Sequence, residues 1–196
     1  MADSEPEGKQ WILERYYMLA LKNHISSVLD VGPGCGTYSR ILRPIDEHIY
    51  WTGVEVWAPY IKEFNLEEKY DHVVVADLRY LDYSKIRRPD CIIAGDVLEH
   101  ISEDDALRIL TELIRLAKVI FVSIPIIPMP QGESEGNPYQ EHVEDSYTHE
   151  RLMKMLPCVC DFNKGARIGT YVLSKDIQVR KIIKEWNELS NYGGAA

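Results

Sequence analysis

The sequence has little of what marks secreted, membrane-spanning or nucleic-acid-binding proteins. Its 196 residues include only four cysteines, too few for a disulfide-stapled scaffold. The longest apolar run, residues 119–130, is short and interrupted by prolines, so no membrane span is expected. Lys and Arg number 22 against 31 Asp and Glu, and the formal net charge of −9 argues against a broad nucleic-acid-binding surface.

The features that are present predict one ordinary globular domain. Hydrophobic residues make up 45% of the chain, enough for a single core within residues 1–196. Cys158 and Cys160 stand too close for an ordinary zinc pair, and no second pair accompanies them. We expect reduced cysteines, a cytoplasmic location and no membrane attachment, because the acidic start of the chain lacks the character of a signal peptide.

The most informative stretch is Val-Leu-Asp-Val-Gly-Pro-Gly-Cys-Gly at residues 28–36. A short apolar run that ends in alternating glycines predicts a buried parallel strand and a tight turn, where a ligand can lie against the main chain. A dinucleotide site would need Gly-x-Gly-x-x-Gly, but the sixth position is Thr37 or Ser39 in the two registers. An NAD-dependent dehydrogenase is therefore the weaker interpretation.

Further strands and helices alternate along the chain. Apolar segments predict strands at residues 49–56, 72–76, 90–95 and 118–124, with helices at residues 7–23, 37–42, 59–67 and 102–117. Ser4 and Glu7 have the spacing of a capping box for the first helix. Glu55 closes the second strand, where a carboxylate can accept both hydroxyls of a ribose. Asp77 closes the third strand and Asp96 follows the fourth, so these acids meet at one edge of a parallel sheet.

Taken together, the glycine turn, Glu55, Asp77 and the Asp-Val-Leu-Glu-His segment at residues 96–100 resemble the class I S-adenosylmethionine (SAM)-dependent methyltransferases, in particular their type 11/12-like small-molecule group. The resemblance implies an α/β, Rossmann-like fold: a mostly parallel seven-stranded sheet with an antiparallel last strand and helices on both faces. Residues 158–162 and 167–174 would form the final hairpin. Asp30 suits SAM, because a carboxylate attracts the sulfonium and ammonium groups of SAM and repels the pyrophosphate of NAD.

The resemblance also assigns candidate residues for binding SAM and its product S-adenosylhomocysteine (SAH). They are Asp30, Gly32, Pro33, Gly34, Gly36, Glu55, Val56, Asp77, Leu78, Asp96 and Val97. In such a fold Asp77 lies beside the adenine amino group. An Asx-type turn at the strand end explains Asp77 equally well.

Transfer to a hydroxyl requires a group that removes or holds the acceptor's proton, and His100, Asp96 and His142 are the candidates. A structural role is an equal alternative for His100. Asp96, Glu99, His100 and His142 also resemble the residues with which small-RNA 3′-terminal 2′-O-methyltransferases bind a divalent metal. Here the first acid is aspartate, one methylene shorter than glutamate, so the main interpretation has no metal.

We expect an enzyme (EC 2.1.1.-) that transfers a methyl group from SAM to a hydroxyl or amine of a small-molecule acceptor. The alternatives are a metal-assisted RNA 3′-terminal ribose 2′-O-methyltransferase and a non-catalytic SAM-binding partner protein. Residues 1–26 form the N-terminal helix region, and the irregular residues 125–147 are expected to cover the acceptor as a lid. Residues 177–196 form a helix that docks on the domain or self-associates, and we expect a monomer or homodimer.

Overall fold

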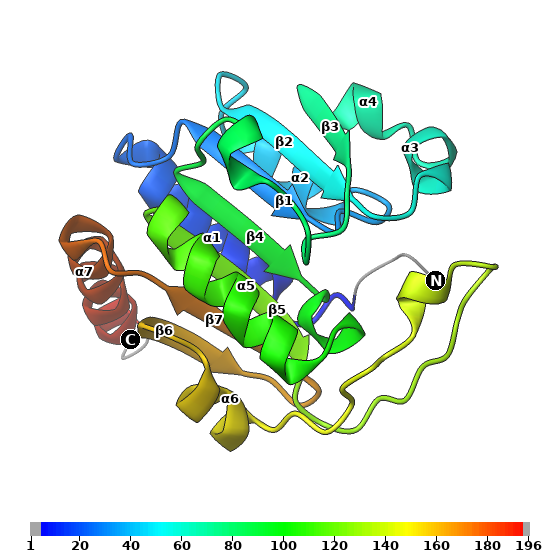
Figure 1. Ribbon diagram of the computed structural model, residues 1–196. Helices are drawn as coiled ribbons and strands as arrows, with labels where there is room; N and C mark the ends of the chain where they lie inside the picture. Colours follow the sequence, from blue (N-terminus) through cyan, green and yellow to red (C-terminus); the bar gives the residue numbers. More distant parts are fainter. Residues whose placement is uncertain (1–4, 194–196) are drawn as a thin grey trace.

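The computed structural model describes residues 5–193, without the side chains of 190–193, and shows a seven-stranded sheet with helices on both faces (Figure 1). The strands are β1 (Ser27–Val31), β2 (Tyr50–Glu55), β3 (His72–Val75), β4 (Cys91–Gly95), β5 (Val119–Pro125), β6 (Val159–Lys164) and β7 (Ile168–Leu173). Their order is β3-β2-β1-β4-β5-β7-β6. Within the described part of the chain, β7 alone runs against its neighbours, β5 and β6, which confirms the predicted sheet.

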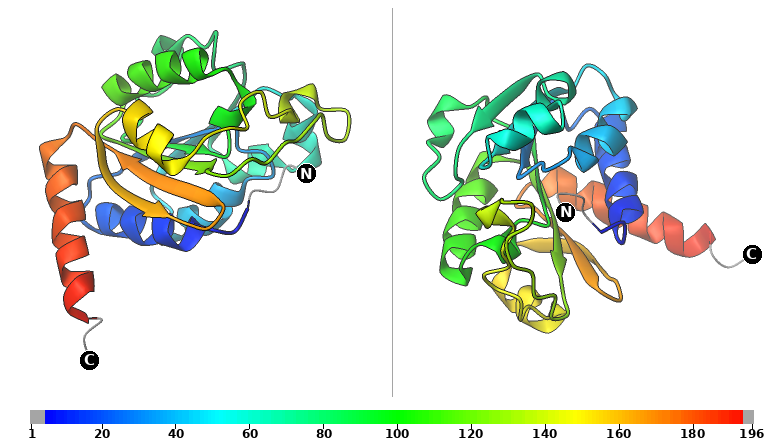
Figure 2. Two further views of the ribbon diagram at one scale, coloured as in Figure 1. Left: turned by 90° about the horizontal axis from the view of Figure 1, so that it is seen from below. Right: turned by 90° about the vertical axis from the view of Figure 1, so that its right-hand side faces the viewer.

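The helices form a layer on each face of this sheet (Figure 2). They are α1 (Lys9–Leu21), α2 (Thr37–Leu42), α3 (Pro59–Glu63), α4 (Leu66–Lys69), α5 (Glu103–Leu116), α6 (His149–Met155) and α7 (Ile177–Gly193). Short 3₁₀ helices cover η1 (Arg43–Ile45), η2 (Tyr83–Lys85), η3 (Leu98–His100) and η4 (Pro138–Gln140). The apolar side chains of α1, α2 and α7 join one core cluster, whereas those of α5 and α6 join the cluster on the other face.

The middle of the sheet is buried on both faces, because parallel strands covered by helices keep no solvent-facing side. Every residue of β1 and β5 is buried. On one face Tyr16 of α1 packs against Trp51 and Phe121, with ring centroids 6.2 and 6.5 Å away. Because β1, β2 and β4 are parallel, their carboxyl ends lie at one edge of the sheet. A crevice for a ligand is expected at this edge, where the strand order reverses between β1 and β4.

The N-terminal helix begins differently from the expectation. α1 starts at Lys9 after Gly8, whose φ of 82° puts it in the left-handed region, and the predicted capping box is wrong. Ser4 lies outside the described residues. The Glu7 carboxylate instead accepts the backbone N–H groups of the turn between β6 and β7, at 2.7 Å from Ala166 and 2.8 Å from both Arg167 and Ile168. These three bonds lower the pKa of Glu7 and tie the start of the chain to the last hairpin.

The helix expected at residues 59–67 is also divided. Asn65 has a φ of 51°, a left-handed conformation that an α-helix does not continue through, so α3 ends before it and α4 begins after it. The remaining predicted strands and helices agree with the structure to within a few residues at their ends.

α7 packs on the molecule's own core. Val179, Ile182 and Ile183 are buried and join the cluster that contains α1, which confirms a docking helix. Ile177 and Leu189 stay exposed on the same helix, and self-association stays a prediction. The four cysteines are free thiols in this structure. Over residues 5–193, no helix has the length and apolar character that crossing a membrane requires.

Candidate active site

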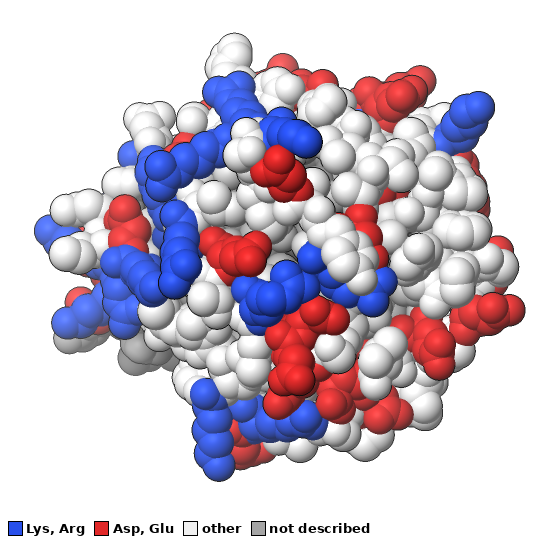
Figure 3. All heavy atoms as spheres, viewed as in Figure 1, with Lys and Arg blue, Asp and Glu red and all other residues white. Residues whose placement is uncertain are grey.

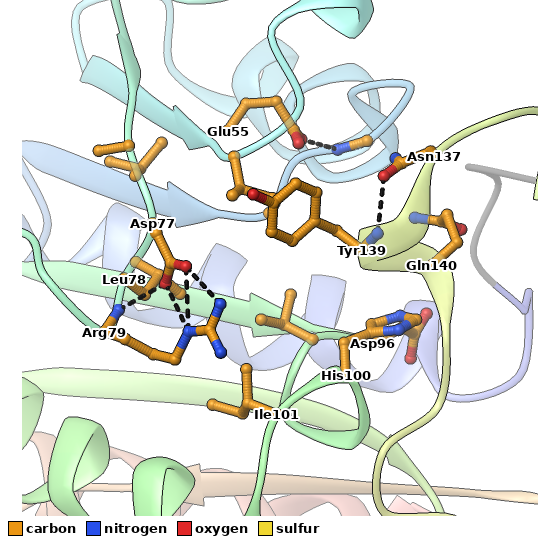
Figure 4. Close-up of a pocket in the computed structure, with 16 residues that line it drawn as sticks. Glu55, Asp77, Leu78, Arg79, Asp96, His100, Ile101, Asn137, Tyr139 and Gln140 are labelled. Atoms are coloured by element: carbon orange, nitrogen blue, oxygen red, sulfur yellow. Dashed lines mark hydrogen bonds and ion pairs between the residues drawn. The ribbon is translucent and has the colours of Figure 1, made fainter. Parts of the chain in front are cut away.

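Two adjoining hollows open where β1, β2 and β4 end. The first, here the Glu55 hollow, is lined by Gly32, Gly34, Glu55, Val56, Asp77, Leu78, Asp96, Val97 and His100, with Asn137, Tyr139 and Gln140 from the loop after β5 (Figure 4). The second, here the His142 hollow, is lined by Gly32, Pro33, Gly34, Tyr38, Asp96, Glu99, His100, Met129, Gln131, Gln140 and His142. The two hollows adjoin along the residues that line both of them, which are Gly32, Gly34, Asp96, His100 and Gln140.

The glycine turn has the backbone that its sequence predicts. Gly32, Gly34 and Gly36 all have positive φ, at 65°, 52° and 79°. A Cβ on Gly32 would stand 2.6 Å from Cγ2 of Val97, so the turn and the segment after β4 approach each other only because this side chain is absent. Gly36 lines neither hollow and serves as the residue at which α2 begins.

Glu55 is a buried acid that lines the Glu55 hollow. It is 4% exposed, and its carboxylate accepts the N–H groups of Gly34 at 3.2 Å and Trp57 at 2.8 Å, one on each oxygen. Burial raises its pKa, against backbone hydrogen bonds from Trp57, Gly34 and Val56 that lower it. Each carboxylate oxygen has a second acceptor position. The acceptor positions that the backbone N–H groups leave open can take ribose hydroxyls, so we expect this carboxylate to bind a ribose.

Asp77 forms the Asx-type turn that sequence reasoning held as an alternative. Its carboxylate accepts the backbone N–H of Arg79 at 2.9 Å and binds the Arg79 guanidinium at 2.6 and 3.0 Å. The Arg79 contacts lower the pKa of Asp77 against an opposing effect of burial. Leu78 and Val56 supply apolar walls suited to a flat ring. Arg79 already binds this carboxylate, and a direct contact of Asp77 with adenine stays a prediction.

Asp30 lies beneath the turn and lines neither hollow. Its side chain is buried, and Tyr70 donates its hydroxyl proton to it over 2.6 Å. Burial raises the pKa of Asp30 to about 7, against the hydrogen bond from Tyr70. We therefore expect Asp30 to influence a ligand through the backbone of the turn and not by direct contact.

The raised pKa of Asp30 gives a pH-dependent stability. The folded chain holds this proton up to about pH 7, whereas the unfolded chain releases it near 3.8. The stabilisation is full below the unfolded value and is lost as the pH rises through about 7. Between pH 5 and 8 the wild type should lose about 3 kcal/mol relative to Asp30→Asn, as measured by denaturant unfolding. If the free energy of unfolding changed equally with pH in the two proteins, Asp30 would not cause the pH dependence.

Asp96 follows β4 with a φ of 56°, and its carboxylate is paired. Lys9 of α1 binds it at 3.0 Å, and the Ser123 hydroxyl donates to it at 2.8 Å. Lys9 is only 8% exposed, and sequence reasoning missed it. Its position on the same helical face as the buried Ile12 and Tyr16 could have indicated that Lys9 faces the interior. Because Lys9 and Ser123 already bind this carboxylate, we expect a binding role for Asp96.

Glu99, His100 and His142 form the other polar group of the site. Each offers one ligand atom, and these atoms all lie within 4.8 Å of one another. His142 comes from the loop after β5, and its ring centroid is 4.8 Å from that of His100. Burial lowers the pKa of His100 and raises that of Glu99 well above its usual range. Asp96, expected as a fourth member, does not belong to this group.

Comparison with known proteins agrees with this arrangement. Residues 29–119 match the family model of a methyltransferase domain. No curated protein matches the chain. Similar solved structures include the PH0226 protein from Pyrococcus horikoshii OT3, at TM-score 0.62 and 14% identity over 88% of this chain and 92% of that one. A SAM-dependent methyltransferase from Clostridium acetobutylicum ATCC 824 has TM-score 0.60 and 15% identity over 84% and 92%. The N-terminal domain of EvdMO1 with SAH bound has TM-score 0.57 and 15% identity over 83% and 81%.

The sheet order and the arrangement of the helices are those of the class I methyltransferase fold. The family match adds the chemistry: residues 29–119 match a methyltransferase domain, which bears out the SAM-dependent methyltransferase, with SAM as its cofactor, that the motifs predicted. The Glu55 hollow fits this cofactor because it combines ribose acceptors on Glu55, apolar walls and a glycine backbone.

Replacing Glu55 with alanine is expected to weaken SAM binding by roughly 1 to 3 kcal/mol, or about 5- to 150-fold, because charge-assisted hydrogen bonds to the ribose are lost. Calorimetric titration with SAH measures the change. Glu68→Ala is the matched control, since Glu68 is an exposed acid on α4 outside both hollows. Equal dissociation constants for wild type and Glu55→Ala would show that Glu55 does not hold the ribose.

Proposed function

We propose that the chain transfers the methyl group of SAM to a hydroxyl or amine of a small-molecule acceptor bound in the His142 hollow. The observation that carries the proposal is the shared wall of the two hollows at Asp96 and His100. With SAM in the Glu55 hollow, an acceptor in the His142 hollow lies on the other side of this wall. Methyl transfer is an in-line displacement, so aligning acceptor, methyl carbon and sulfur supplies most of the rate gain.

The loop after β5 and the surface charge near the acceptor site favour a small molecule. Met129, Gln131, Gln140 and His142, all from the loop after β5, line the His142 hollow and cover it from one side. On the face shown in Figure 3, the surface toward the right, the direction in which β2 and β4 point in Figure 1, is mostly uncharged, and its charged side chains are more often Asp or Glu than Lys or Arg. An RNA end would need a basic track along its phosphates.

The imidazoles suit a hydroxyl acceptor. The carbonyl oxygens of Glu141 and Met129 lie 3.0 and 2.5 Å from Nδ1 of His100 and His142. A carbonyl only accepts, so each Nδ1 carries the proton in the neutral ring and Nε2 keeps a lone pair. The lowered pKa of His100 keeps it neutral at neutral pH, able to receive a proton from the acceptor.

Transfer of a labelled methyl group from SAM into a fractionated cell extract tests the proposal. We expect label in low-mass material that resists ribonuclease. Label in ribonuclease-sensitive material would replace the proposal with the RNA 3′-terminal alternative. SAM binding without transfer into any fraction would favour the non-catalytic partner protein.

A further inference from the structure

The group of Glu99, His100 and His142 contains a buried carboxylate oxygen that the fold leaves without a partner. Glu99 is 2% exposed, and its Oε2 has no hydrogen-bond partner among the described residues. A buried polar atom without a partner destabilises the fold, and more so when it is charged. Glu99 lines the His142 hollow, so the unpartnered side chain adjoins a space that a ligand can enter.

The two histidines are oriented as metal ligands usually are. Each points Nδ1 at a backbone carbonyl, at 3.0 Å to Glu141 and 2.5 Å to Met129, which fixes the tautomer and leaves Nε2 as the ligating nitrogen. Metal-bound histidines commonly donate their other N–H to a carbonyl or carboxylate in this way. The loop is itself held to η3, because the N–H of Glu144 donates to the Glu99 carbonyl over 3.0 Å.

We propose that Glu99, His100 and His142 bind one divalent transition-metal cation, and that this cation holds an oxygen of the acceptor. Two imidazoles with one carboxylate suit ions of the manganese-to-zinc series better than magnesium. Three protein ligands leave positions for acceptor oxygens, as in catalytic sites. Ligands around one ion at about 2.1 Å lie at most about 4.2 Å apart, so the present spread of up to 4.8 Å closes by small side-chain rotations.

The role of the cation in methyl transfer rests on the proposed function. It narrows the acceptor to an oxygen compound and the product to an ether or an ester. A hydroxyl next to a divalent cation is a stronger acid and loses its proton to solvent more readily. The acceptor oxygen then forms a bond to the methyl carbon while the carbon–sulfur bond breaks. The electron pair of that bond stays on sulfur and gives SAH. The imidazoles act as ligands in this scheme, in place of the base role open to them without a cation.

Metal binding is tested on the full chain without SAM. Titration with Co²⁺, followed by visible absorption, and with Mn²⁺ and Zn²⁺, followed by calorimetry, should give one ion per chain. Glu99→Gln and His142→Asn should each weaken binding at least about tenfold. Glu68→Gln and His48→Asn are the matched controls, since both residues are exposed and lie outside the two hollows. The affinity of each variant for SAH, measured in parallel, should equal that of the wild type. An unchanged affinity would show that the variant is folded.

Binding of less than one ion per chain, or equal affinities for wild type and Glu99→Gln, would overturn the metal site. Its role in transfer is tested by comparing chelator-treated protein with protein resupplied with Mn²⁺. Full methyl transfer by metal-free protein would overturn that role and leave the proposed function standing. One tightly bound ion without methyl transfer to any acceptor would instead remove the proposed function and leave the metal site.

Discussion

Gly34→Val should abolish SAM binding, with a loss of at least about 100-fold that calorimetric titration with SAH would detect. Gly34 has a φ of 52°, where a β-branched residue is strongly strained. Gly34 lines both hollows, so we expect an added side chain to narrow the space that the cofactor or the acceptor needs. Its N–H also holds Glu55 at 3.2 Å, and a displaced turn would release that carboxylate.

The matched control is Gly132→Val. Gly132 lies in the loop after β5, and a Cβ there would meet nothing within 4 Å. This variant should bind SAH as the wild type does. A melting curve for each variant separates lost binding from lost folding. Wild-type affinity in a folded Gly34→Val protein would contradict the assignment of the glycine turn to the cofactor.

Asp96→Asn should destabilise the fold by about 3 kcal/mol, because it leaves the Lys9 ammonium buried without its counter-charge. The ammonium lies 3.0 Å from the carboxylate, with side-chain exposures of 10% for Lys9 and 17% for Asp96. Methyl transfer should fall as well, since Asp96 lines the wall between the hollows. Urea unfolding with and without SAH measures the two effects.

A double-mutant cycle with Lys9→Met separates the ion pair from other consequences of each change. Removing both charges leaves neither one unpaired, so the double variant should be more stable than the sum of the two single losses predicts. Simple additivity would mean that Lys9 and Asp96 do not depend on each other. α1 would then contribute packing alone to the site.

The strands and the glycine turn could be predicted from sequence because their signals are local. Each buried strand is a short apolar run, and the alternating glycines of residues 32–36 allow the positive φ that the turn requires. Glu55 was found in the same way, since it follows directly from the position where β2 ends. The acid and histidine of residues 99–100 were identified by their sequence pattern.

The pairings across the chain could not be predicted, because they depend on tertiary contacts between distant segments. Lys9 reaches Asp96 only once α1 lies across the end of β4, and His142 reaches His100 only through the path of the loop. Glu7 resembled a helix cap in spacing but found better donors in the last hairpin. Asp30 fits the motif, yet the pleat of β1 turns its side chain toward Tyr70 and away from both hollows.

A crystal structure of the chain with SAH is the most direct test of the central claim that the Glu55 hollow holds the cofactor. It should show both ribose hydroxyls within hydrogen-bonding distance of the Glu55 carboxylate, the adenine between Val56 and Leu78, and the sulfur at the wall shared with the His142 hollow. SAH bound elsewhere, or with its ribose turned away from Glu55, would contradict the account.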